Sequence, residues 1–121
     1  MAKNLEIPFL LDFYGEMLTK KQRDFLAYYY EDDLSLSEIA ENEGITRQGV
    51  RDSVKRAEAQ LFDMEERLGL AKRFNEMKKS VDEIIICAEA VNNYNLNHSL
   101  SMEINDNIAR IKTLASFLKE G

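Results

Sequence analysis

The sequence predicts an all-α protein with a helix-turn-helix N-terminal bundle and a long C-terminal helical hairpin. The chain has one Pro and five Gly in 121 residues, so few positions interrupt a helix. Apolar residues recur every three or four positions over long stretches, which is the period of a helix, and no run alternates apolar and polar residues as a strand would. We expect two domains, a helix-turn-helix domain over residues 1–69 and a C-terminal helical segment over residues 70–121.

The first two helices are predicted from their start signals. Pro8 suits the first turn of a helix, and Gly15 indicates where that helix ends. Thr19 and Gln22 match a capping box, in which each side chain bonds the other residue's backbone N–H. In the helix that follows, we expect a split between buried and partly exposed aromatic positions: Phe25, Leu26 and Tyr29 inside, Tyr28 and Tyr30 partly exposed.

The helix-turn-helix is predicted from residues 35–57. Ser35 and Glu38 match a second capping box. Gly44 lies where the helix must end, because Gly takes the left-handed conformation without steric cost. We expect Ile45 to fill the corner of the turn and Thr46 to cap the next helix. Two helices joined by a short Gly-containing turn match the motif whose second helix lies in the DNA major groove.

The second helix of the motif separates into two faces at ~100° per residue. The apolar face, expected to pack on the preceding helices, consists of Val50, Val54, Ala57 and Leu61. The polar face holds side chains that can bond base edges or phosphates. We therefore predict a DNA-contacting set of Thr46, Arg47, Gln48, Arg51, Asp52, Lys55 and Arg56.

The charge distribution keeps a second interpretation open. The net charge is −6, and residues 1–69 hold 9 basic and 15 acidic side chains, whereas residues 70–121 hold 7 of each. Residues 46–57 nevertheless carry a local charge of +3. Local phosphate neutralisation supports nucleic-acid binding, but an acidic surround weakens non-specific affinity. The alternatives are a solvated basic face, or an adaptor that binds RNA or protein without sequence-specific DNA binding.

The C-terminal half predicts two helices with apolar seams. Apolar residues continue at helical spacing from Leu61 to Val91, with a break expected at Gly69. We expect the Asn-rich segment 92–99, which includes His98, to form a loop. Ser101 is the predicted cap of a last helix.

Two helices with such seams leave apolar surface uncovered if they stand alone. Helix-turn-helix proteins commonly use two-fold symmetry to read two half-sites. We therefore expect a homodimer, with a monomeric bundle as the alternative. The predicted dimerisation residues are Met77, Val81, Ile84, Ala88, Val91, Ile104, Ile108, Ile111 and Leu118.

The sequence shows no catalytic or metal-binding pattern, such as a Ser-His-Asp set, a His pair or a Gly-rich phosphate loop. The acidic run 31–33 lacks the alternating ligands and Gly of a calcium loop, so we expect a solvated turn. Cys87, the single cysteine, lies among apolar residues and is expected to be buried. We expect no enzymatic activity, no cofactor and no metal.

The N-terminus lacks the apolar run of a secretory signal, and no apolar stretch approaches the ~18 residues of a membrane span. A single cysteine also fits a reducing compartment. We expect a cytoplasmic protein with no membrane insertion.

Residues 18–62 resemble region four of bacterial sigma factors. The similarity lies in the capped helix, the tyrosines, the acidic turn, and the SLSEIA and GIT motifs. The chain departs from that family at Glu43, where an apolar residue is usual beside the turn Gly.

The whole chain, most clearly from Phe9 to Phe74, resembles the YlxM family of small bacterial helix-turn-helix proteins. The resemblance implies a DNA-binding regulatory role, with the presumed contacts falling on the set named above. It also implies participation in the signal recognition particle pathway, with components of that particle as partners.

Overall fold

The computed structural model describes residues 1–120, and within them all regular structure is helical. The helices are α1 (Ile7–Tyr14), the short 3-10 helix η1 (Gly15–Met17), α2 (Lys20–Tyr30), α3 (Leu36–Glu43), α4 (Arg47–Leu68), α5 (Leu70–His98) and α6 (Met102–Glu120). The predicted all-α fold class is therefore confirmed. The chain divides into two compact units after Lys72, three residues beyond the boundary expected from the sequence.

The predicted start signals of the bundle helices are confirmed. Thr19 Oγ1 accepts a hydrogen bond from the Gln22 N–H at 3.2 Å, and the Gln22 side chain accepts one from the Thr19 N–H at 3.1 Å. Ser35 and Glu38 form the same reciprocal pair at the start of α3. These caps satisfy backbone donors that a helix start otherwise leaves unpaired.

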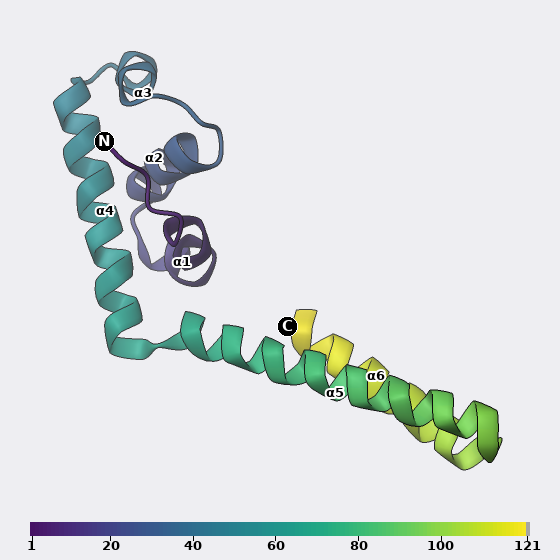
Figure 1. Ribbon diagram of the computed structural model, residues 1–121. Helices are drawn as coiled ribbons and strands as arrows, with labels where there is room; N and C mark the ends of the chain where they lie inside the picture. The colour runs from purple at the N-terminus through teal and green to yellow at the C-terminus, as the bar shows by residue number, and fades with distance from the viewer. Residues whose placement is uncertain (121) are drawn as a thin grey trace. The chain divides into compact units, whose positions relative to one another are not determined.

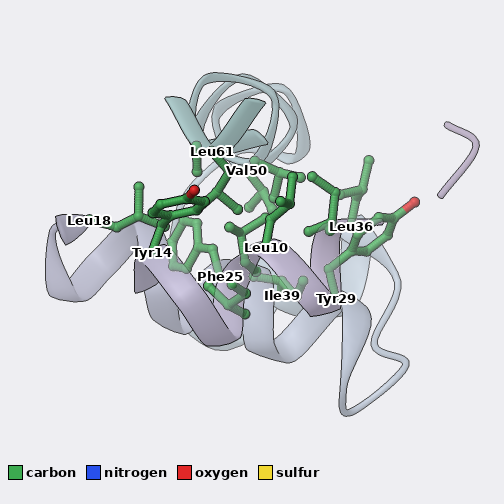
Figure 2. Close-up of a cluster of buried hydrophobic side chains, with 14 of the residues drawn as sticks. Leu10, Tyr14, Leu18, Phe25, Tyr29, Leu36, Ile39, Val50 and Leu61 are labelled. Atoms are coloured by element: carbon green, nitrogen blue, oxygen red, sulfur yellow. The ribbon is translucent and has the colours of Figure 1, made fainter. Parts of the chain in front are cut away.

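The core of the first unit lies between α4 and the three helices before it. In Figure 1, α1, α2 and α3 lie along one side of α4. Figure 2 shows Val50 and Leu61 pointing from α4 into a cluster that includes Phe25 and Ile39. Phe25, Leu26 and Tyr29 are buried and Tyr28 and Tyr30 half-buried, as predicted.

Three hydrogen bonds to Glu65 that the sequence did not predict hold the end of α4 and the start of α5. Gly69 takes the left-handed conformation (φ 63°) that ends α4, as expected at this break. The Glu65 carboxylate accepts hydrogen bonds from the N–H groups of Ala71 and Lys72, both at 3.1 Å. Tyr14 donates its hydroxyl to Glu65 at 2.7 Å, and burial together with this carboxylate raises the pKa of the Tyr14 phenol. The first turn of α5 therefore belongs to the bundle, which explains the later boundary.

From Arg73 onward, α5 and α6 form an antiparallel hairpin (Figure 1). Its turn is tied by Asn95, which is buried. The Asn95 side-chain amide donates to the Ser101 carbonyl at 2.9 Å, and the Asn95 side-chain oxygen accepts the Ser101 N–H at 2.8 Å. Ser101 Oγ accepts a longer bond from the Ile104 N–H at 3.3 Å, so the predicted cap of the last helix is present.

The expectation of a loop over residues 92–99 was wrong. The helix α5 continues through this segment to His98, which is its last residue. Asn costs a helix only a fraction of a kcal/mol per residue. The Asn95 contacts and the stacking of His98 on Tyr94 (ring centroids 4.0 Å apart) accompany this continuation.

The expectation of a buried Cys87 was also wrong, because its side chain is exposed on α5. Cys87 follows the apolar residues 84–86, but a helix turns by ~100° per residue and so cannot bury four consecutive side chains against one partner helix. Val81 and Ala88 face α6 instead and are buried.

Candidate nucleic-acid interface

The turn between α3 and α4 sets where the polar face of α4 begins. Gly44 has φ 68°, the left-handed conformation expected of a helix stop. Thr46 caps α4, since its Oγ1 accepts a hydrogen bond from the Gly49 N–H at 3.0 Å. Ile45 does not fill the corner as expected, because 38% of it is exposed.

The buried face of α4 fixes the direction of its other face. The four positions predicted to be apolar and internal have 0% exposure: Val50, Val54, Ala57 and Leu61. A helix held this firmly along one stripe has no freedom to rotate about its axis. The opposite stripe must therefore face solvent.

Every residue of the predicted DNA-contacting set is exposed, from Thr46 to Arg56. Within residues 1–120, none of Arg47, Arg51, Lys55 and Arg56 forms an ion pair. Lys3, by contrast, pairs with Asp33 at 3.0 Å. The four cations on α4 are thus available to an external anion.

One contact on this face was not predicted. The Gln48 side-chain amide donates a hydrogen bond to an Asp52 carboxylate oxygen at 2.9 Å, one turn further along α4. The spacing of four residues could have indicated it, because such pairs face each other on a helix. The contact orients Gln48 and satisfies one of its two donors, which leaves its other donor and its oxygen for a partner.

The arrangement provides what binding to a polyanion requires. Arginine presents a planar fork of donors that suits phosphate and guanine. The backbone N–H groups in the first turn of a helix have no partner within the helix, so those of α4 that Thr46 does not cap can donate to a phosphate. The neighbouring helix α3 packs on α4 and carries Glu41 and Glu43, which are exposed. Within the motif, positive charge therefore lies on the α4 face and negative charge on α3, which favours one docked orientation over loose electrostatic attraction.

The predicted dimerisation residues fall into two groups. Val81, Ala88 and Ile108 are buried within the hairpin itself, and Met77 is half-buried. The other five have 37–51% of their surface exposed: Ile84, Val91, Ile104, Ile111 and Leu118. The sequence did not separate these groups, because both lie at the same helical spacing.

Residues 1–120 contain no group of His, Cys, Asp and Glu placed to hold a metal ion. The acidic turn 31–33 is exposed, as a solvated turn should be. Among the described helices, none is both long enough and apolar enough to span a bilayer.

The fold and the capped, exposed second helix of the motif define a helix-turn-helix protein. Residues 1–101 match the family described as "Putative helix-turn-helix protein, YlxM / p13 like", and the chain belongs to that family. The resemblance predicted from the sequence is therefore confirmed.

Relatives of similar length support the assignment. The chain is 49% identical over 80 residues to a UPF0122 protein of Desulforamulus reducens, covering 66% of this chain and 68% of that one. It is 49% identical over 85 residues to a UPF0122 protein of Acetivibrio thermocellus, covering 70% and 73%. It is 45% identical over 84 residues to a UPF0122 protein of Exiguobacterium sibiricum, covering 69% and 79%.

Proposed function

We propose that this protein is a non-enzymatic, cytoplasmic DNA-binding regulator that acts as a homodimer and inserts α4 into the DNA major groove. Arg47, Gln48 and Arg51 on the first turns are assigned to base edges and the nearest phosphates. Lys55 and Arg56, one turn further, are assigned to the backbone. Two copies then read two half-sites about one DNA turn apart.

One observation carries the proposal. The chain confines four unpaired cations to the exposed face of a helix whose opposite face is completely buried. Membership of a helix-turn-helix family adds support, because this is the helix that such proteins place in the groove. Residues 46–57 carry a local charge of +3 in a chain of net charge −6, so the positive charge of this face is a local feature of α4.

The test selects bound fragments from random DNA and then compares variants on the winning site. Arg51→Ala should weaken specific binding by roughly 5- to 150-fold, the range for losing a base-contacting arginine. Lys55→Ala should weaken specific and non-specific DNA alike and lower the salt slope by about 1. Both side chains are exposed, so thermal unfolding should hardly change.

Arg67→Ala is the matched control. Arg67 is an exposed arginine of the same helix, but it lies near its other end and is paired with Asp63 at 3.0 Å. It should bind the selected site like the wild type. If Arg67→Ala and Arg51→Ala weaken binding equally, the recognition face is assigned wrongly.

The acidic surround of α4 favours one second candidate, an adaptor that binds RNA or protein of the targeting machinery through the same face. A parallel selection from random RNA and a pull-down with signal recognition particle components distinguish it. Retention of RNA or of a particle protein, with no DNA retarded at low salt, would replace the DNA proposal.

A further inference from the structure

The hairpin carries two apolar rows on each helix, and each row repeats every seven residues. One row is buried between α5 and α6: Val81 and Ala88 on α5, Ile108 and Ala115 on α6, with the polar Asn95 at the end of the α5 row. The second row is 37–51% exposed: Ile84 and Val91 on α5, Ile104, Ile111 and Leu118 on α6. The alternating spacing of four and three residues is that of the a and d positions of a coiled coil. A single hairpin therefore buries only one of the two rows.

The two flanks of the hairpin differ in chemistry. On one flank, Lys119 Nζ lies 2.6 Å from Asp82 Oδ1 and Lys112 Nζ lies 3.7 Å from Glu89 Oε1, so ion pairs bridge α5 and α6. Counted from Val81 at ~100° per residue, these α5 carboxylates lie at ~80–100°.

The opposite flank of the hairpin is apolar. At ~240–300° on the same count lie Ile84, Cys87 and Val91. There a groove of about 510 Å³ runs between the helices and is lined mainly by apolar side chains, with Ile111 facing it from α6.

We propose that this apolar flank is the dimer interface, and that its occupant is the same flank of a second copy, completing a four-helix bundle. The inference deepens the dimeric part of the proposed function and depends on it. The interface then consists of Ile84, Cys87, Val91, Ile104, Ile111, Leu114 and Leu118. The buried row holds α5 and α6 of each hairpin together.

The heptad spacing of the exposed row argues for a second copy. A row that repeats every seven residues is matched by helices with the same repeat, and each hairpin supplies two of them in antiparallel order. A two-fold axis brings the same patch of both copies face to face, so the apolar flank of one hairpin can pack against the apolar flank of the other.

The charge and the area also fit a second copy. Residues 70–121 hold seven basic and seven acidic side chains, so two hairpins do not repel each other, unlike two acidic bundles. The six Ile, Val and Leu residues of the flank are each 37–55% exposed, so together they present a contiguous apolar area for a partner to cover.

The experiment measures the mass of the full chain by light scattering during size exclusion at micromolar concentration. The wild type should run at twice the chain mass of 14.0 kDa. Ile84→Glu should run at a single chain mass, because it places two charges in the interface, while circular dichroism should show unchanged helix content. Ile111→Glu repeats the test from α6, should Ile84→Glu fail to fold.

Ile86→Glu is the matched control. Ile86 lies two residues from Ile84 on the same helix and is 65% exposed, but it points away from the apolar flank at ~140°. This variant should remain a dimer. A wild type of single mass, or a dimer that survives both Ile84→Glu and Ile111→Glu, would overturn the proposal.

Cys87 provides a readout that needs no substitution. It is the only cysteine and lies in the proposed interface. Labelling by N-ethylmaleimide, followed by mass spectrometry, should be slow in the wild type, faster on dilution, and fast in Ile84→Glu. Equal rates at all concentrations would contradict burial of this flank.

The two proposals fail separately. A monomeric wild type whose DNA binding is still lost in Arg51→Ala leaves the DNA function standing and removes the interface. A dimer that Ile84→Glu dissociates, but that retards no DNA, keeps the interface and removes the DNA function.

Discussion

Tyr14, Phe25 and Leu26 are completely or almost completely buried in the N-terminal bundle, whereas the apolar residues that the hairpin buries are Val81, Ala88, Ile108 and Ala115, with no aromatic ring among them. The bundle has three helices to cover the apolar face of α4, so its large side chains find contacts on all sides. The hairpin has one helix to cover another. The bundle therefore has a complete core within one chain, whereas the core of the hairpin is thin until a further surface covers its second apolar row.

The largest change in stability is expected when a core side chain is removed from each unit. Phe25→Ala should lower the free energy of unfolding of the bundle by about 3–5 kcal/mol, the cost of losing a buried aromatic side chain and leaving a cavity. Val81→Ala should cost about 1–2 kcal/mol, since it removes two methyl groups from a thin core. Native-state hydrogen exchange, followed separately on α2 and α5, measures the two effects. Equal losses would show that the hairpin is packed as densely as the bundle.

A smaller effect is expected at the turn of the hairpin. Asn95→Ala removes both hydrogen bonds to Ser101, and we expect the hairpin to lose about 1–3 kcal/mol, since the Ser101 groups lose their buried partner. Hydrogen exchange of α6 should accelerate while that of α2 stays unchanged. Asn97→Ala, an exposed position on the same helix, should change neither. Acceleration in both units would mean that Asn95 supports more than the turn.

The parts of the fold that the sequence predicted well are those set by neighbouring residues. The capping boxes at Thr19 and Ser35 and the stops at Gly44 and Gly69 each depend on a few adjacent side chains and a backbone angle. Helical periodicity likewise predicted which side of α4 is buried, because a single stripe of that helix is apolar.

The parts that it missed depend on partners far along the chain. Tyr14 bonds Glu65 across 51 positions, and no local pattern indicates that pair. Composition suggested a loop at residues 92–99, but the contacts of Asn95 with Ser101 accompany a helix there. For the hairpin, periodicity gave both apolar rows and could not tell which one α6 covers. Cys87 was expected to be buried because it lies among apolar residues, but a helix cannot bury a run of consecutive side chains against one partner helix.

The smallest expected effect concerns pH and again separates the two units. Burial and the hydrogen bond with Glu58 raise the pKa of Tyr30 to about 12, whereas a tyrosine in the unfolded chain ionises near 10. The folded bundle favours the protonated form of this phenol. The contribution of Tyr30 to the stability of the bundle is therefore fully present below pH 10 and is lost as the pH rises toward 12.

Tyr30→Phe should therefore lower stability at pH 8 by about 1 kcal/mol, through loss of the hydrogen bonds with Glu58 and the Asn4 N–H, yet flatten the decline between pH 9 and pH 11. Urea unfolding at each pH measures both quantities. Tyr94→Phe, an exposed tyrosine of the hairpin, serves as the control and should leave the decline unaltered. If the stability of Tyr30→Phe falls between pH 9 and pH 11 as steeply as that of the wild type, the alkaline loss arises from other groups of the bundle. Tyr14 is then the next residue to substitute, because burial raises its pKa as well.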